Sequence, residues 1–457
     1  WRTLCENGDQ DGLARGLPGL VRLLEGRSAF EEGVASLTSA REVAAGALAA
    51  ELDAHRGGFL LRLGRPLEAK NLLLAALRSA QAAKNDHAIA LALLRLGSAH
   101  DALGEYRFAD QVLREALEMA ERGNDLERRM AASSALGLVA MHRSDLVEAT
   151  DTFQEALALA RSLDQDTATA YGLNNLALAL QRRGDYMGAL PLVEESLAIS
   201  RRVGDPYAMA EGLTSLGILS YALEDHAGAK DAFEESLRTY QRVGNRAKVA
   251  GAYNNLSGVL HALGDLDGAI RMVERSLAVR DEIGDRKGTL LGLHNLGNFH
   301  QAAGNHVEAM ARFRQALDGA RSLGHVREQV ATLSSMASCA LEQELRDEAW
   351  GSLQEALTLA RTIEANDVLL DVLANAARAM AQDDAERALA IATTVHRHPS
   401  CLPSTKRNVA ALVAALAASV SADGVRRATE RAGATSLPEV VAELLSHGAM
   451  VDEPGSA

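Results

Sequence analysis

Residues that bind transition metals cluster once in the sequence, where His396, His398 and Cys401 fall within the segment HRHPSC. Imidazole and thiolate are the ligands that zinc prefers, and a structural zinc site uses four of them. Three candidate ligands lie close together in this segment, but no fourth is evident, and the segment follows the end of a helical pattern. We therefore interpret it as a solvated turn and predict no metal site.

Catalytic motifs are absent from the sequence. It contains no G-x-x-x-x-G-K-[ST] phosphate loop, no H-E-x-x-H zinc motif and no G-x-S-x-G nucleophile elbow. The carboxylate pairs Glu194-Glu195 and Glu234-Glu235 lie opposite the apolar positions of a helical pattern, so an exposed acidic face is expected. We predict a protein that is not an enzyme and uses no cofactor. An enzyme with an unrecognised site is the least favoured alternative.

Asparagine recurs at a regular interval in the middle of apolar helical patterns. Asn175 lies in YGLNNLALAL and Asn255 in AYNNLSGVL, and the distance between them is twice the distance from Asn255 to Asn295. Amides are middling helix formers, so their place inside helices needs a reason. An amide offers two donors and an acceptor without needing a charged partner, which suits hydrogen bonding to a peptide backbone. What these amides contact depends on the elements that position them.

The composition indicates packed helices and argues against several classes of function. Aromatic residues make up only 4% of the 457 residues and proline occurs 8 times, while alanine and leucine are abundant. The net charge of −14, without a Lys/Arg cluster, argues against direct binding of nucleic acid. No apolar run without a charge approaches the length that a membrane span needs, roughly 18 residues, so no span is expected. Three separated cysteines, Cys5, Cys339 and Cys401, indicate reduced thiols in a cytoplasmic protein.

The sequence repeats itself with a period of about 40 residues. A single unit of this kind cannot bury its apolar face alone, so the units are expected to stack on one another. Two columns of the repeat are alanine at 69, 109, 149, 189, 229, 269, 309 and 349, and leucine at 77, 117, 157, 197, 237, 277, 317 and 357.

Each unit is predicted to contain two helices and two short turns. Leu173, Leu176 and Leu180 share one face of a first helix, and Ala189 belongs to the apolar face of a second. Gly184 lies between them, where a glycine suits the left-handed residue that ends a helix. The recurring alanine is expected where the two helices cross most closely, because a methyl group lets the backbones approach. Other units carry the same turn residue at Gly64, Gly104, Gly264 and Gly304, and replace it with Ser144, Glu224 and Glu344.

These residues resemble the tetratricopeptide repeat. The order that carries the resemblance is Leu-Gly or Leu-Ala in the first helix, Gly at its end, and then Ala, an aromatic or aliphatic residue, and Leu in the second helix. The commonest period of the family is about 34 residues, and the period here is longer. The chain therefore resembles the long-repeat type of the family, which occurs in kinesin light chains and bacterial signal-sensing proteins. The resemblance implies an all-α fold, a right-handed α-solenoid superhelix of stacked antiparallel helix pairs.

The resemblance also implies where a ligand would bind. In the family the first helices line a concave groove, and the residue before the consensus leucine points into it; here that column is Arg95, Ala135, Asn175, Ser215, Asn255, Asn295 and Ser335. Members that bind peptides use asparagine there, so a protein or peptide ligand in the groove is expected, although the amides could instead bond a neighbouring helix. The candidate ligand-binding residues are Asn174, Asn175, Gln181, Arg182, Tyr221, Asn254, Asn255, His261, Asn295, Asn298 and Gln301.

The two ends of the chain depart from the repeat. We expect residues 1–46 to form a degenerate helical unit that caps the array, residues 47–366 eight repeats, 367–398 a degenerate ninth pair, 399–449 capping helices and 450–457 a disordered tail. Pro399 and Pro403 are expected to break the chain. The helices expected near the ends are Leu13–Leu24, Phe30–Val43, Val368–Met380, Ala385–His396, Thr405–Val420 and Pro438–Leu445.

The segment LVRLLEGRSAFEEGVASL is similar to the entry of the C-terminal sensor module of bacterial STAND ATPase regulators, which include the maltose-regulator, SARP and LuxR-like types. This looser resemblance implies a ligand-sensing module of signal transduction or transcription regulation, with a nucleotide-binding module before it. A first residue that is Trp1 rather than methionine fits a piece of a longer protein. The alternative is a stand-alone adaptor that assembles protein partners.

Overall fold

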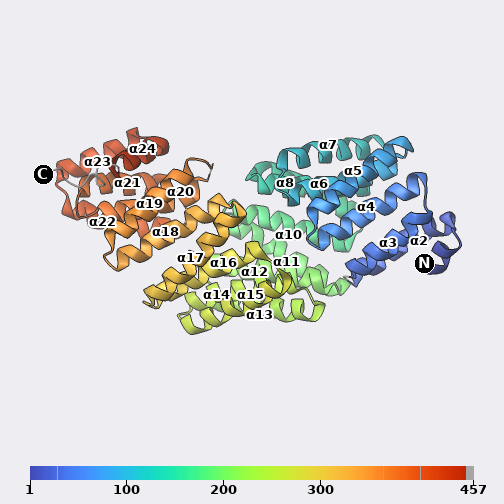
Figure 1. Cartoon of the computed structure of the whole chain (residues 1–457), viewed down its shortest axis with the longest axis horizontal. Coiled ribbons are helices and arrows are strands. Elements are labelled where there is room, and N and C mark those ends of the chain that lie inside the picture. Colours follow the sequence, from blue (N-terminus) through green and yellow to red (C-terminus); the bar gives the residue numbers. More distant parts are fainter. Residues whose placement is uncertain (28, 364, 402, 449–457) are drawn as a thin grey trace. The chain divides into compact units, whose positions relative to one another are not determined.

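The computed structural model of the protein describes residues 1–27, 29–363, 365–401 and 403–448. Within these residues it contains 24 α-helices and no strand (Figure 1). The predicted all-α class and the stacking of helix pairs into an α-solenoid are therefore confirmed. The predicted tail Met450–Ala457 lies outside the described residues.

The helices have nearly constant lengths through the repeats. In the N-terminal half they are α1 (Arg2–Glu6), α2 (Gln10–Gly26), α3 (Phe30–Val43), α4 (Gly46–Arg62), α5 (Pro66–Ala82), α6 (Asp86–Ala102), α7 (Tyr106–Arg122), α8 (Leu126–His142), α9 (Leu146–Ser162), α10 (Asp166–Arg182), α11 (Tyr186–Val203), α12 (Pro206–Ala222) and α13 (His226–Val243). They continue with α14 (Arg246–Ala262), α15 (Leu266–Ile283), α16 (Arg286–Ala302), α17 (His306–Leu323), α18 (Val326–Glu342), α19 (Arg346–Ala360), α20 (Asn366–Met380), α21 (Ala385–Arg397), α22 (Pro403–Ser419), α23 (Ala422–Ala434) and α24 (Leu437–Gly448).

The chain divides into two compact units, unit 1 over Trp1–Thr239 and unit 2 over Tyr240–Ala457. In each unit the first helix of a repeat packs on its own second helix and on the first helix of a neighbouring repeat, as α4 does with α5 and α6. The same pattern joins α18 to α19 and α20 in unit 2. The first helices are α4, α6, α8, α10 and α12 in unit 1 and α14, α16, α18 and α20 in unit 2.

The turns between the two helices of a repeat contain a left-handed residue, and in some of them the side chain of the next residue caps the second helix. Gly184 has φ +83°, and the side chain of the next residue, Asp185, accepts a hydrogen bond from the backbone N–H of Gly188. The same arrangement precedes α9, where Asp145 caps the helix after Ser144, a serine with φ +61°. The predicted left-handed turn is thus confirmed even where the sequence lacks glycine, at a cost of roughly 1 kcal/mol.

The two helices of a repeat are also in close contact at a second column of small residues, the glycine of the Leu-Gly pair in the first helix, for which the sequence predicted no such contact. A Cβ atom added to Gly297 of α16 would lie 2.5 Å from the ring of Phe313 in α17, a distance that real Cβ contacts do not show. Ala309, in the predicted alanine column, is fully buried in the same core cluster as Phe313. The equivalent glycine and large-residue pairs of unit 1 are Gly57–Leu73, Gly97–Leu113, Gly137–Phe153 and Gly217–Phe233.

The end helices complete the cores of the two units. In unit 1, Leu13 and Leu24 of α2 pack with Leu37 of α3 and Phe59 of α4. In unit 2, side chains of α22, α23 and α24 join the core built by α18 to α21. The predicted break lies between α21 and α22, and Pro403 begins α22 two residues before the predicted start at Thr405, at a position where proline needs no N–H partner. We did not predict α1 or α23.

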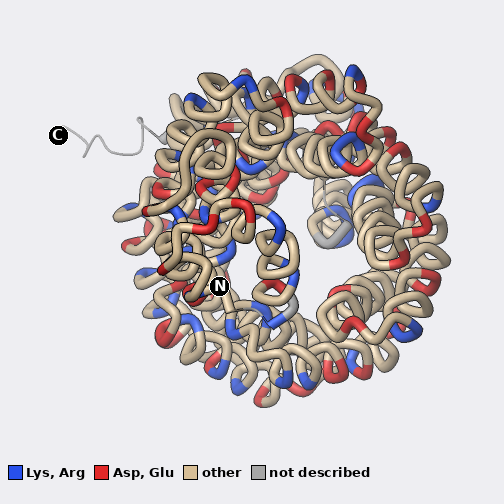
Figure 2. The backbone as a smooth tube through the Cα atoms, turned by 90° about the vertical axis from the view of Figure 1, so that its right-hand side faces the viewer, with Lys and Arg blue, Asp and Glu red and all other residues tan. Residues whose placement is uncertain are grey.

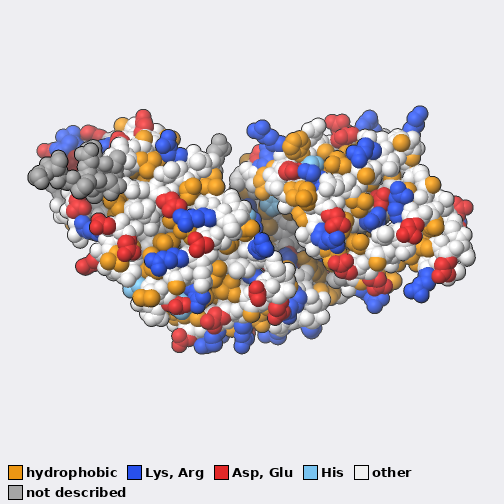
Figure 3. All heavy atoms as spheres, in the orientation of Figure 1, with side chains coloured by type: hydrophobic (Ala, Val, Ile, Leu, Met, Phe, Trp, Pro, Cys, Tyr) orange, Lys and Arg blue, Asp and Glu red, His pale blue; other side chains and the backbone are white. Residues whose placement is uncertain are grey.

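Charged residues of both signs are interspersed along the helices (Figure 2), and on the face shown in Figure 3 their side chains lie among hydrophobic ones. Some join successive repeats, as Arg161 does with Glu195 at 2.7 Å. Glu194 and Glu195 are exposed, as expected, whereas Glu234 and Glu235 are half-buried. Among the described residues, no helix is long and apolar enough to cross a membrane.

Candidate functional site

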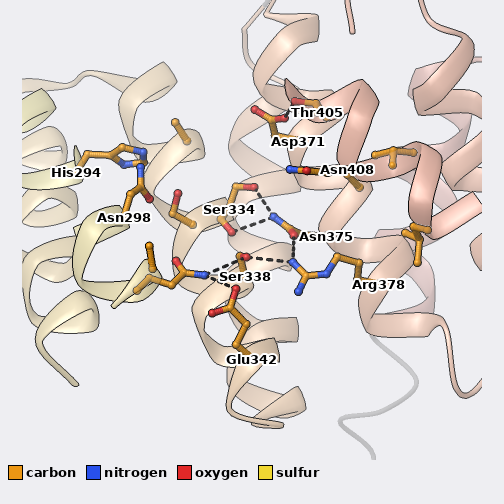
Figure 4. Close-up of a pocket in the computed structure, with 17 residues that line it drawn as sticks. His294, Asn298, Ser334, Ser338, Glu342, Asp371, Asn375, Arg378, Thr405 and Asn408 are labelled. Atoms are coloured by element: carbon orange, nitrogen blue, oxygen red, sulfur yellow. Dashed lines mark hydrogen bonds between the residues drawn. The ribbon is translucent and has the colours of Figure 1, made fainter. Parts of the chain in front are cut away.

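A polar pocket lies in unit 2, on the side formed by the first helices of successive repeats. It is lined by α16, α18, α20 and α22 and encloses about 440 Å³. Its volume falls in the range of pockets that hold small ligands or short segments of larger ones. Ser334, Ser335 and Ser338 of α18 line it, and their short side chains leave space between α16 and α20 (Figure 4).

Hydrogen bonds connect the polar side chains of the pocket (Figure 4). The amide of Asn375 donates to the carbonyl of Ser334 at 3.1 Å and to its hydroxyl at 3.0 Å. Arg378 donates from Nη1 to Ser338 Oγ and to Asn375 Oδ1, both at 3.1 Å. Gln301 donates to Glu342 at 2.7 Å. The network holds these side chains in defined positions and leaves a surface that can both donate hydrogen bonds to a ligand and accept them from it.

Two titratable groups of the pocket are shifted by their surroundings. Burial raises the pKa of the Asp371 carboxyl, although Thr405 of α22 donates a hydrogen bond to it. Burial also lowers the pKa of His294 to about 4, so its ring is neutral near pH 7. That ring packs 5.7 Å from the ring of Phe313. The pocket therefore offers His294 as a neutral hydrogen-bonding group rather than as a cation.

The structure brings only part of the predicted set to this pocket. Asn298 and Gln301 line it. Asn295 instead donates to Asn254 Oδ1 at 2.8 Å and so joins two successive repeats. Asn255 is half-buried and makes no side-chain hydrogen bond within the described residues. His261 is exposed on α14, with its ring 5.2 Å from that of Phe299.

The other predicted residues lie in unit 1, on α10 and α12. Asn174 and Asn175 are half-buried; the Oδ1 atom of Asn174 has no hydrogen-bond partner, and Asn175 makes no side-chain hydrogen bond within the described residues. Arg182 donates to the carbonyl of Met141 at 3.3 Å, and Gln181 beside it is half-buried. Tyr221 is 41% exposed, with its ring 5.2 Å from that of His226.

The segment that could have held a metal shows ordinary turn contacts. The backbone N–H of Ser400 donates to Nδ1 of His398 at 3.1 Å. Across the described part of the chain, no three His, Cys, Asp or Glu side chains lie close enough together to hold a metal ion.

The sequence profile described as "Tetratricopeptide repeat" matches residues 48–122, 166–242 and 248–322. These matches follow the helix pairs observed in both units. This chain is a tetratricopeptide repeat (TPR) protein. In general terms, the protein is therefore a protein-binding scaffold. No curated protein matches the chain in sequence.

Solved structures share the TPR fold at low sequence identity. The signal transduction ATPase with numerous domains (STAND) protein PH0952 of Pyrococcus horikoshii, which has a tetratricopeptide repeat sensor, is 13% identical with a TM-score of 0.54. The match covers 81% of this chain but only 52% of that protein. A Rap protein complexed with competence and sporulation factor is 13% identical with a TM-score of 0.54, over 84% of this chain and 99% of that one. The quorum sensor NprR of B. thuringiensis is 12% identical with a TM-score of 0.54, over 74% and 99%.

Several residues that line the pocket were not predicted from the sequence. Asn375 could have been predicted, because it lies two repeat periods after Asn295 and continues the same column into the ninth helix pair. Asp371 and Arg378 carry no such signal, since they belong to a repeat whose pattern is eroded. Thr405 and Asn408 reach the pocket from α22, which follows the eroded pair.

Substitutions in the column of Asn175, Asn255 and Asn295 test whether these amides stabilise the fold or serve to contact a ligand. Asn295→Ala should lower the free energy of unfolding by about 1 kcal/mol, because it removes a half-buried hydrogen bond between repeats. Asn175→Ala is the matched control, since it changes the same column position where no side-chain hydrogen bond exists within the described residues. Urea unfolding of both variants, with Asn254→Ala to complete a double-mutant cycle, measures the difference. Equal effects of the two substitutions would show that the Asn295–Asn254 bond contributes nothing.

Proposed function

We propose that this TPR array is a non-catalytic sensor that binds a protein or peptide segment, and that the pocket of unit 2 is its principal ligand site. The observation that carries the proposal is the convergence of amide and hydroxyl side chains from four helices around about 440 Å³. Such groups can pair with both the N–H and the C=O of a ligand backbone. They also need no charged partner in the ligand. The remaining predicted residues, on α10, α12 and α14, would extend the contact surface within their own units.

The most specific form of the proposal is the ligand-sensing module of a bacterial STAND-type ATPase that acts in signal transduction or transcription regulation. The fold shared with PH0952 over 81% of this chain supports it, as does the similar entry segment. A nucleotide-binding module would then precede Trp1, and the ligand would act by binding one of its states more tightly. The proposed regions are those predicted from the sequence: a cap over 1–46, repeats over 47–366, a ninth pair over 367–398 and end helices after it.

A stand-alone adaptor is the second candidate, since a TPR scaffold alone suffices for it. The coding sequence upstream of Trp1 separates the two. A phosphate-loop motif there supports the STAND sensor, and a nearby start codon supports the adaptor. In either case we propose that the protein is cytoplasmic, because Cys5, Cys339 and Cys401 form no disulfide and thiols stay reduced in that compartment.

The site assignment is tested by filling the pocket. We expect peptides selected from a random library of free synthetic peptides, from tripeptides to dodecapeptides, to bind the whole chain, and Ser335→Tyr to weaken that binding at least tenfold, because the ring would occupy the space between α16 and α20. Ser352→Tyr is the matched control, since Ser352 lies on the second helix α19 and does not line the pocket. The melting temperature checks the fold of both variants. A library that yields no binder contradicts the function, and equal binding by Ser335→Tyr contradicts the site.

A further inference from the structure

The pocket of unit 2 is lined by two side chains of opposite charge, and within the described residues neither makes an ion pair. Arg327, which pairs with Asp367, acts on Asp371 only at longer range. Asp371 accepts a hydrogen bond from Thr405, and within the described residues no Lys, Arg or His lies at ion-pair distance from it. Arg378 bonds only to the neutral side chains of Ser338 and Asn375. The other carboxylate of the pocket, Glu342, is occupied by the amide of Gln301. Asp371 is half-buried and Arg378 is exposed. A ligand with both counter-charges would therefore pair with a partly desolvated carboxylate, where an unpaired charge is costly, and with a guanidinium that is accessible from solvent.

The spacing of the two charges sets the length of that ligand. Asp371 and Arg378 are two helical turns apart on α20, which places them on one face of the helix about 10 Å apart along its axis. Figure 4 shows them on either side of Asn375. An extended peptide advances about 3.3–3.6 Å per residue, so about three residues span the same distance. The volume of about 440 Å³ is in keeping with a ligand of that size.

The wall between the charges can bind a peptide backbone. Asn298 of α16 and Asn408 of α22 line the pocket, and their amide groups make no hydrogen bond within the described residues. Each can donate to a carbonyl and accept from an N–H of a segment that passes between them. Arg378 also keeps its Nε and Nη2 groups free within the part of the chain that the structure describes, because only Nη1 bonds to Ser338 and Asn375. A guanidinium edge of this kind matches the two oxygens of a carboxylate.

We infer that this pocket takes a short peptide with both termini free, its ammonium group at Asp371 and its carboxylate at Arg378. The inference rests on the proposed function, and it narrows the ligand from any protein segment to a zwitterionic peptide the size of a tripeptide. A long protein segment would meet the pocket without its termini and would leave both charges unpaired. The peptide side chains would add selectivity but are not required for this end-to-end recognition.

The test uses trialanine, because its only charges are its two termini. Calorimetric titration of the whole chain should show binding of trialanine at least tenfold tighter than binding of N-acetyl-trialanine or of trialanine amide. Asp371→Asn keeps an acceptor for Thr405 and should abolish the preference for a free amino group alone. Arg378→Gln should abolish the preference for a free carboxylate alone. Both variants should keep the melting temperature of the wild type to within a few degrees.

Matched controls and the contrary outcomes separate this inference from the proposed function. Asp347→Asn and Arg361→Gln change the same residue types at exposed positions outside the pocket and should leave both preferences intact. Equal binding of free and blocked trialanine, or no binding of trialanine at millimolar concentration, overturns the inference. Library peptides that still bind in a manner blocked by Ser335→Tyr would then leave the proposed function standing.

Discussion

Replacing Gly297 with alanine should destabilise unit 2 by about 2 kcal/mol, although alanine is normally the better helix former. A Cβ atom at this position would lie 2.5 Å from Cε1 and 2.6 Å from Cδ1 of Phe313, whose ring is fully buried. The ring cannot move aside without disturbing the core around it, and overpacking of this kind costs about 1–3 kcal/mol. The midpoint of urea unfolding measures the change.

Gly258→Ala is the matched control for this prediction. Gly258 is also an interior glycine of a first helix in unit 2, but no atom lies within 4 Å of its added Cβ. This substitution should therefore stabilise the protein by about 0.5–1 kcal/mol, through the helix preference of alanine. Combining Gly297→Ala with Phe313→Leu should recover part of the loss, since the smaller side chain removes the aromatic edge. If Gly297→Ala stabilises as Gly258→Ala does, the close approach of α16 and α17 is wrong.

The stability of the protein should fall as the pH is lowered from about 6.5 to about 4, with His294 as a principal cause. Burial lowers the pKa of His294 in the folded state to about 4, whereas an unfolded histidine titrates near 6.5. Between these values the unfolded chain binds the proton and the folded chain does not, so acid favours unfolding. The loss begins below about pH 6.5 and is complete below about pH 4, where it amounts to at most about 3 kcal/mol.

His294→Gln should flatten this pH dependence, because glutamine takes up no proton. Urea unfolding of wild type and variant at several values between about pH 7 and pH 4.5 gives the two slopes. His55 in unit 1 should add a separate contribution, since burial, with help from Arg95 and His87, lowers its pKa to about 4 as well. Identical slopes for wild type and His294→Gln would show that His294 has the same pKa in the folded and unfolded chain, and so that burial does not lower it.

The repeats could be predicted because the same physical demand recurs eight times. Ala309 and its counterparts must be small and buried, and Gly184 must adopt a left-handed conformation, so each leaves a periodic trace in the sequence. The glycine column that includes Gly297 contributed to the prediction only as part of the Leu-Gly pattern, because glycine inside a helix normally weakens the helix and does not by itself indicate a close contact. Its role became clear only when Phe313 was found against it.

The pocket was harder to predict, because its chemistry depends on which side chains meet. Asn295 and Asn175 hold equivalent positions, yet within the described chain only Asn295 has an amide partner, at Asn254. Asp371 could be seen as a carboxylate but not as an unpaired one, since pairing is decided by neighbours distant in the sequence, such as Thr405. The helix α23 was missed for a simpler reason: its sequence, ADGVRRATERAGA, has few large apolar residues to mark a buried face.

The caps at Asp145 and Asp185 have a consequence for how the gene can change. Both residues follow a left-handed position, and both begin a second helix in the same way, one repeat period apart. Unequal crossing-over between the two coding segments would join Ser144 directly to Asp185 and drop one helix pair without creating a foreign junction. The reverse event would insert a pair just as smoothly. Such an array can therefore gain or lose whole repeats during evolution, because each new junction between repeats keeps a turn that is compatible with folding.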